Sequence, residues 1–391
     1  MRLYRADFGW LAVGFLFLCG GISACRSRTP PPQTTEKIEA EALLNSLAEK
    51  VESPVNFYVS PSGNDGGDGS AAHPWKTLEK AATMAAPGVT VHVAAGDYQF
   101  NDMELKTFTS GAASGRLRYV SDTRWGARLR STKTGNAAVW WNKGDYVDIV
   151  GFDISGAGAL GIYNEGSHTR IVGNSVHDIP APGCPETGGA GINDGNYRGS
   201  DDDIIDNWVH DVGEYNVPCQ KVHGIYHSNA GGHILNNVVF HNQGWGIHLW
   251  HAATHVTVSG NTVFSNGYGG IVVGSDPADF SGSRGRNDNT LVERNIVFQN
   301  GLRPDARGYG IMEYGAVGAD NRYISNLVYR NLPADMKISG ENESGTIHAD
   351  PQFINYRPDG KGDYHLRPQS PACSSGWRHV ACRELSNPAG Q

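Results

Sequence analysis

The chain has 391 residues and a formal net charge of −8, from 32 basic and 40 acidic residues. This acidic balance leaves no basic footprint for nucleic acid, so neither DNA nor RNA is expected as a partner. The 51 glycines are about twice the usual share of ~7 %, and only 18 % of the residues are charged. Many tight turns around an ordinary core are therefore expected, which excludes a coiled coil or a helical bundle.

Residues 1–24 have the pattern of an export signal, with two early arginines and then an apolar stretch from Trp10 to Leu18. That stretch is too short for a membrane span of about 20 residues. The sequence ISAC at residues 22–25 resembles the lipobox of bacterial lipoproteins. The resemblance implies a lipid on Cys25 and attachment to the outer membrane, facing either the periplasm or the outside. A plain secretory signal that contains a cysteine by chance is the alternative.

Residues 25–55 are expected to join this anchor to a folded body. Residues 26–35 are rich in Pro, Thr and Arg, which is typical of a tether. Residues 36–51 have apolar side chains at helical spacing and predict a short surface helix.

An Asn-x-Val unit recurs six times in the middle of the chain, with its asparagines 33, 30, 24, 34 and 31 residues apart. A Gly-Ile unit follows most of these repeats. Such periods, built from short β-branched runs and Gly/Asn turns, predict coils of parallel β-helix that stack about 4.8 Å apart. Stacked asparagines are expected to hydrogen-bond from coil to coil. The six asparagines are Asn174, Asn207, Asn237, Asn261, Asn295 and Asn326.

The flanks of this region carry further motifs, which are FYVSPSGND at 57–65, PWKTL at 74–78, DPQF at 350–353, DYHL at 363–366 and SPA at 370–372. With the repeats, they resemble bacterial right-handed parallel β-helix proteins of the pectate-lyase-like superfamily. The resemblance implies an all-β, right-handed parallel β-helix over residues 56–376, followed by a tail at 377–391. It also implies a helix near Thr77–Ala86 that caps the open end of the solenoid, where strand edges would otherwise be exposed.

Placing each Ile of the Gly-Ile units inside the coil predicts which neighbours face outward. The outward row contains aromatic and polar side chains, which suits a carbohydrate groove in which aromatic faces stack on sugar rings. A solvated sheet face is the alternative. The first outward row is Tyr163, Asn193, Tyr226, His248, Val272 and Met312. The predicted substrate contacts are Asn193, Tyr226, Trp250, His251 and Tyr314.

The inward row contains Asn164, Asp194 and His227 in three successive coils. Polar side chains inside a solenoid would need hydrogen bonds to one another. Alternatively the strands turn early, and Asp194 and His227 reach solvent. Both arrangements remain open at this point.

Two long loops, 179–190 and 212–223, occupy the same position in neighbouring coils. Each contains a cysteine, so a Cys184–Cys219 disulfide is predicted, and Cys373–Cys382 would close a small loop near the C-terminus. No C-x-x-C zinc spacing occurs. Loops joined by a disulfide on a rigid solenoid are a usual place for a functional site. The loop at residues 275–288 would add a further wall to the predicted groove.

Basic and imidazole side chains gather beside these loops. Lys221, His223, His227 and His248 are the candidates for the base that removes the C5 proton of a uronate in β-elimination. Either cationic side chains or calcium would neutralise the uronate carboxylate. Hard carboxylate oxygens suit calcium, and the candidate ligands are Asp194, Asp201, Asp202 and Asp203.

Together with these residues, the resemblance implies a polysaccharide lyase that acts as a monomer, although the net charge of −8 suits a polyanionic substrate poorly. A glycoside hydrolase or an epimerase is the second hypothesis. The carboxylates of Asp194 and Glu313 lie four coils apart, roughly 19 Å, whereas hydrolases use ~5–9.5 Å. The third hypothesis is a glycan-binding or structural surface protein without catalytic activity.

Overall fold

The computed structural model describes residues 55–251, 253–276, 285–374 and 382. The predicted signal, lipidation site, tether and first helix lie outside these residues, as does the tail apart from Cys382. The chain divides into two units, Met1–Val51 and Glu52–Gln391, and the description below concerns the second. In the described ranges, no helix is long and apolar enough to cross a membrane.

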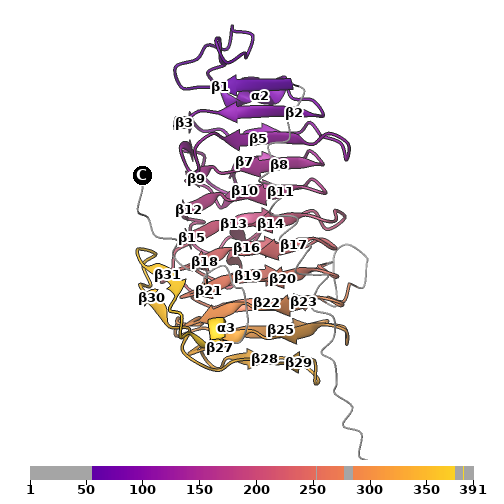
Figure 1. The fold of residues 1–391 in the computed structure, drawn as a ribbon, viewed down its shortest axis with the longest axis vertical. Coiled ribbons are helices and arrows are strands. Elements are labelled where there is room, and N and C mark those ends of the chain that lie inside the picture. The colour runs from indigo at the N-terminus through magenta and orange to yellow at the C-terminus, as the bar shows by residue number, and fades with distance from the viewer. Residues whose placement is uncertain (1–54, 252, 277–284, 375–381, 383–391) are drawn as a thin grey trace, which may run out of the picture. The chain divides into compact units, whose positions relative to one another are not determined.

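Three parallel sheets wind around one core, and most coils contribute a strand to each sheet (Figure 1). Sheet A contains β1 (Val55–Val59), β2 (Val89–Val93), β5 (Leu117–Ser121), β8 (Val147–Val150), β11 (Arg170–Val172), β14 (Asp203–Ile205), β17 (His233–Leu235), β20 (Thr257–Ser259), β23 (Leu291–Glu293), β26 (Arg322–Ile324) and β29 (Glu343–Ser344). Sheet B contains β3 (Gly96–Phe100), β6 (Ala127–Ser131), β9 (Asp153–Gly156), β12 (Ser175–Ile179), β15 (Trp208–Val212), β18 (Val238–Phe240), β21 (Thr262–Phe264), β24 (Ile296–Phe298) and β27 (Leu327–Tyr329). Sheet C contains β4 (Leu105–Thr107), β7 (Ala138–Asn142), β10 (Leu160–Asn164), β13 (Gly189–Asp194), β16 (Val222–His227), β19 (Trp245–Leu249), β22 (Gly269–Ser275), β25 (Ile311–Gly315) and β28 (Met336–Lys337). The predicted right-handed parallel β-helix is confirmed.

The six repeated asparagines form a buried ladder at one corner of the coils. Each side-chain amide donates a hydrogen bond of 2.9–3.1 Å to the Oδ1 of the next asparagine, from Asn174 to Asn326. The same Oδ1 also accepts the backbone N–H of the preceding asparagine. All six side chains are fully buried, so the ladder satisfies turn groups that water cannot reach. A second ladder runs from Asn242 to Asn331 in the same way.

The Gly-Ile units align in register along sheet C. Their isoleucines pair with one another from Ile162 to Ile311 and are completely buried. The residues that follow them pair in the predicted outward row, from Tyr163 to Met312. The repeat therefore assigns the faces of this sheet correctly, because apolar burial sets its period.

The two ends of the described region are covered differently. At the N-terminal coils, α2 (Leu78–Thr83) begins after Thr77, whose hydroxyl accepts the Lys80 N–H at 3.2 Å. Leu78 and Ala81 of α2 are buried in the core, as expected of the predicted helix.

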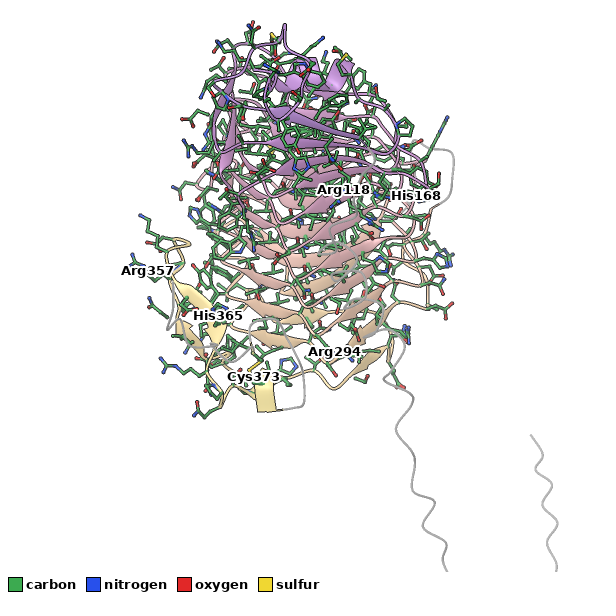
Figure 2. All side chains as sticks on the ribbon, turned by 45° about the horizontal axis from the view of Figure 1, so that its top comes forward. Arg118, His168, Arg294, Arg357, His365 and Cys373 are labelled. Carbon is green, nitrogen blue, oxygen red and sulfur yellow. A yellow bond between two sulfur atoms is a disulfide. The ribbon has the colours of Figure 1, made fainter. Side chains whose placement is uncertain are left out.

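Near the C-terminus, an antiparallel hairpin of β30 (Phe353–Asn355) and β31 (Asp363–Leu366) packs against the aromatic side chains of sheet B. Tyr364 lies 4.5 Å from Phe264 between ring centroids. Figure 2 shows Arg357 and His365 on this hairpin and Cys373 in α3 (Pro371–Ser374).

Both predicted disulfides are present, with Cys184 bonded to Cys219 and Cys373 bonded to Cys382. Disulfides persist in oxidising compartments, so they indicate an extracytoplasmic protein. The first joins the long loop before β13 to the long loop before β16, which places both loops beside the same stretch of sheet C.

Candidate functional site

A groove of about 900 Å³ lies over the outer face of sheet C and between the disulfide-joined loops. It is lined by residues of the outward row and of the adjoining loops, so the predicted groove is present. All five predicted substrate contacts line the groove, and four of them are aromatic or imidazole side chains. They are Asn193, Tyr226, Trp250, His251 and Tyr314.

Aromatic rings cover much of the floor and walls. Trp250 stacks on Tyr314 with 5.8 Å between ring centroids, and Tyr314 is 58 % exposed. Trp250 lies flat over the next strand because Gly274 has no side chain, where a Cβ would come within 2.5 Å of the indole. Exposed aromatic faces in a groove suit the apolar faces of sugar rings.

His223 and His248 form a pair at the centre of the groove. His248 Nδ1 lies 2.9 Å from His223 Nε2, so the N–H of one ring donates a hydrogen bond to the other ring. Burial lowers the pKa of His223 to about 3, and burial together with His223 and His251 lowers the pKa of His248 well below its usual value. Both rings are therefore neutral at neutral pH. His248 is partly exposed to the groove, whereas His223 is 5 % exposed beneath it.

The loop that precedes His223 is held in two ways. The Cys184–Cys219 disulfide joins it to the neighbouring loop. The Arg303 guanidinium, which is nearly buried, donates hydrogen bonds of 2.8–3.0 Å to the carbonyls of Val217, Cys219 and Gln243. These contacts fix the backbone that carries Lys221 at the rim of the groove.

The charged side chains that line the groove are two cations and two anions, namely Lys221, Arg307, Glu186 and Asp276. All four are exposed. Lys221 Nζ also donates to the Glu186 carbonyl at 3.4 Å. The groove itself is thus close to neutral, unlike the whole chain with its net charge of −8.

His227 and Asp194 do not reach the groove. Both are completely buried, with His227 Nδ1 2.7 Å from Asp194 Oδ2 and His227 Nε2 3.2 Å from the Gly231 carbonyl. The Asn229 amide also donates 2.9 Å hydrogen bonds to Asp194 and Asp202. Of the two arrangements open for the inward row, the one with internal hydrogen bonds is therefore correct. The prediction that His227 is a base in contact with substrate is corrected, because solvent and substrate cannot reach it.

The candidate calcium ligands do not converge on one site. Asp202 is nearly fully buried and accepts the Thr169 N–H and the Asn229 amide. Asp203 lies 2.8 Å from His233 Nδ1, while Asp201 is exposed with a positive φ of 61°. Among the described residues, no three or more His, Cys, Asp or Glu side chains are placed to hold a metal ion. These aspartates therefore do not fit calcium, and no step of the chemistry is assigned to it.

Other residues that line the groove were not among the predicted contacts. Trp245 packs edge-on against Tyr268 at 5.4 Å, and both line the groove with Tyr163, Tyr197 and Arg307. Alternation is the sequence signal for strand residues, but it places Trp245, two positions before the inward Ile247, inside the coil and so misses its contact with the groove. The loop residues carry no such signal, since loops have no period.

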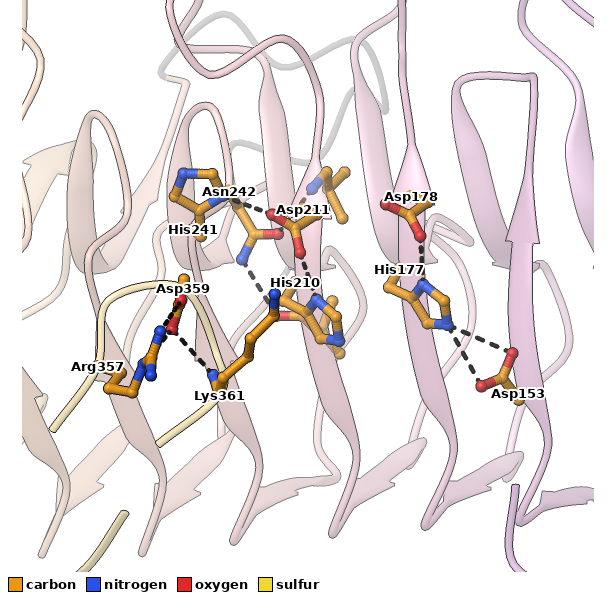
Figure 3. A network of polar contacts seen from close by, with 12 residues as sticks. Asp153, His177, Asp178, His210, Asp211, His241, Asn242, Arg357, Asp359 and Lys361 are labelled. Atoms are coloured by element: carbon orange, nitrogen blue, oxygen red, sulfur yellow. Dashed lines mark hydrogen bonds and ion pairs between the residues drawn. The ribbon is translucent and has the colours of Figure 1, made fainter. Parts of the chain in front are cut away.

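A second group of histidines lies on sheet B, away from the groove lining (Figure 3). His177 Nδ1 lies 2.8 Å from Asp178 and its Nε2 lies 3.3 Å from Asp153. Asp211 contacts His210 at 2.7 Å and His241 at 2.5 Å. We refer to Asp153, His177, Asp178, His210, Asp211 and His241 as the His–Asp network.

Comparison with known proteins agrees with the fold described above. The chain is 30 % identical over 152 residues to pectate lyase L of Paenibacillus polymyxa (strain SC2), covering 37 % of this chain and 33 % of that one. The match thus spans about one third of that relative's own length. The crystal structure of pectate lyase Pel9A superposes with a TM-score of 0.59 at 14 % identity, covering 82 % of this chain and 91 % of that one. Residues 57–331 match the family described as Pel9A-like, right-handed beta helix region. The chain therefore belongs to the Pel9A-like right-handed β-helix family.

Proposed function

We propose that this protein cleaves an acidic, uronate-containing polysaccharide by β-elimination. The observation that carries the proposal is the neutral His223–His248 pair at the centre of an aromatic groove. A neutral imidazole accepts a proton, and the aromatic side chains around it suit a sugar chain. The pectate lyase relative described above supports the same reaction class.

In this mechanism His248 removes the C5 proton of a uronate. In this role His248 Nδ1–H donates the hydrogen bond to His223 Nε2, so Nε2 of His248 carries the lone pair that accepts the proton. The C4–O bond breaks as the C4–C5 double bond forms, and the leaving oxygen takes a proton from the groove. Tyr226 is the proposed donor, because its ring lies 5.4 Å from that of His248.

The bound uronate itself would raise the proton affinity of His248. A carboxylate near an imidazole favours the protonated ring, so substrate binding opposes the effect of burial on the pKa of His248. Lys221 and Arg307, which line the same groove, would stabilise the negative charge that develops on the carboxylate. Lys221 is retained as the second candidate for the base.

Hydrolysis by the carboxylates considered from the sequence has little support. Asp194 is enclosed as described above. Glu313 is 6 % exposed, and its oxygens accept hydrogen bonds from the Tyr323 hydroxyl at 2.9 Å and the Ser339 N–H at 2.8 Å. Neither carboxylate reaches a glycosidic bond in the groove.

The N-terminal sequence supports a proposal about location. We propose that Cys25 carries a lipid and that the tether holds the β-helix at the outer membrane. Labelling cells with a radioactive fatty acid tests this, because replacing Cys25 with Ser would abolish the label. Label that persists in the Cys25→Ser variant would refute the anchor.

The activity is tested by incubating the purified chain with polygalacturonate, alginate and other uronans. Elimination predicts a rise in ultraviolet absorbance from the new C4–C5 double bond, together with new reducing ends. New reducing ends without the absorbance would mean hydrolysis. Binding without either product would mean a carbohydrate-binding protein, and both results would overturn the proposal.

A further inference from the structure

The outward row of sheet C continues beyond the groove toward the N-terminal coils. In register, Tyr163 of β10 pairs with Trp141 of β7, which pairs with Lys106 of β4 at the sheet edge. Trp141 is partly exposed and stacks on Tyr163, with 6.0 Å between centroids and 22° between planes. Phe108, 50 % exposed, meets the Trp141 ring edge-on at 5.4 Å. Two aromatic side chains therefore continue the line of the groove.

Two lysines flank this aromatic surface. Lys106 Nζ lies 5.2 Å and Lys143 Nζ 4.6 Å from the centroid of the Trp141 ring. Glu165 Oε2 accepts the Trp141 indole N–H at 2.6 Å and lies 3.1 Å from Lys143 Nζ. The indole is thus held in one orientation by a hydrogen bond at its edge. The two lysines and Glu165 together carry a net charge of +1. The groove lining, with two cationic and two anionic side chains, carries no net charge.

We propose that Lys106, Phe108, Trp141 and Lys143 form a second sugar subsite that binds a uronate residue of the polysaccharide occupying the groove. We call these four residues the tryptophan subsite. The two ammonium groups lie over the indole and would turn aside to pair with the carboxylate of the sugar, whose apolar face would then stack on the ring. The inference rests on the proposed function for the identity of the polymer, and its test by binding does not depend on cleavage.

The position of the tryptophan subsite relative to His248 determines which substrates use it. Four coil steps separate β7 from β19, through β10, β13 and β16, which is roughly 19 Å at ~4.8 Å a coil. A chain must span several sugar residues to reach both places. Short oligosaccharides bound at His248 leave the subsite empty, so it would favour long chains.

The test is affinity electrophoresis through gels that contain polygalacturonate or, as a neutral comparison, dextran. The chain offers a matched control, because the Arg124 guanidinium lies 4.8 Å from the Trp125 ring outside the outward row. Trp141→Ala and Lys106→Ala should each weaken binding to polygalacturonate by about three- to tenfold, and Arg124→Ala should leave it unchanged. Added salt should reduce the difference between Lys106→Ala and the unsubstituted chain.

Unchanged binding in both variants would overturn the inference, whether or not the protein cleaves anything. Equal retention by dextran, with no effect of Lys106→Ala, would refute a uronate as the ligand. If the variants bind polygalacturonate more weakly but the unsubstituted protein has no lyase activity, the subsite is supported and the proposed function is refuted. Lys106→Ala keeps the test decisive if Trp141→Ala fails to fold, since Lys106 is exposed. If the chain is active, Trp141→Ala should lose more activity on long chains than on short oligosaccharides.

Discussion

The histidines of the groove and those of the His–Asp network lie in opposite environments on one solenoid. His223 and His248 contact each other and aromatic rings, and burial lowers the pKa of both. In the network every imidazole contacts an aspartate (Figure 3). There the hydrogen bonds and charges of Asp153 and Asp178 outweigh burial and raise the pKa of His177.

The difference shows that a cluster of histidines is not in itself a catalytic signal. In the His–Asp network the ring nitrogens are used by carboxylates, and the ladder of His177 stacked on His210 at 5.1 Å joins neighbouring coils. Among the described residues of the groove, no carboxylate is in direct contact with the pair, so the rings stay neutral and can each accept a proton. We therefore expect chemistry in the groove and stability from the network.

The largest expected effect is on catalysis by His248. His248→Gln should reduce the rate of elimination by roughly 10²–10⁴-fold, because it removes the general base. The matched control is His241→Gln in the network, which should leave the rate unchanged. Initial rates from ultraviolet absorbance measure both, and near-normal activity of His248→Gln would remove the distinction between the two regions.

A smaller effect is expected for His223, which acts through His248 and is a positioning residue. His223→Gln should lower kcat by about tenfold, the cost of one misplaced hydrogen bond, with little change in KM. It should also shift the acid limb of the kcat/KM profile to higher pH, since His223 helps to lower the pKa of His248. A purely structural role would lower activity without moving that limb.

The next prediction concerns stability in acid. Because the pKa of His223 falls to about 3 in the folded chain, the unfolded chain binds a proton below pH ~6.5 that the folded chain does not. His248 behaves in the same direction. Stability should thus fall as the pH drops from about 6.5, by up to about 1.4 kcal/mol per pH unit for each ring. Urea unfolding gives the free energy of unfolding at each pH from about 6.5 to about 5. This free energy should fall less steeply with falling pH in the double variant His223→Gln, His248→Gln than in the unsubstituted chain. Equal dependence on pH in the two proteins would refute the buried neutral pair.

The smallest effect is expected in the network. Asp211→Asn should destabilise the fold by about 1 kcal/mol at pH 7, because one carboxylate serves two imidazoles, and should leave elimination unchanged. The two histidines hold the pKa of Asp211 below its usual value. Its stabilisation is therefore present above pH ~3.8 and is lost as the pH falls further. Urea unfolding should show the gap between Asp211→Asn and the unsubstituted chain closing in that range.

The coils and the outward row could be predicted because one physical constraint repeats along the chain. Each Gly-Ile unit must bury its isoleucine, and each Asn-x-Val unit must satisfy a buried turn, so both recur from coil to coil in the middle of the chain. His227 could not be placed by the same reasoning. Its place in the strand predicted a buried side chain, whereas its polar imidazole suggested contact with solvent. The structure resolves the conflict, because Asp194 binds His227 and is itself bound by Asn229 in the interior.

Long-range pairings also escaped prediction. The partnership of Asp211 with His241 joins residues 30 positions apart, and the Trp141–Lys106 contact joins coils that lack the Gly-Ile marker. Arg303 reaches carbonyls 84 and 86 residues earlier in the chain. No local pattern encodes such contacts, because they depend on how the coils stack.

The asparagine ladder has a consequence for how this protein family can vary. Within the ladder each asparagine bonds to the asparagines directly before and after it, and its other hydrogen bonds go to nearby backbone carbonyls, so a coil could be duplicated or deleted with the remaining rungs unchanged. Each added coil would lengthen the outer row by about 4.8 Å. The number of coils between β7 and β19 therefore sets the shortest polymer that can touch both Trp141 and His248.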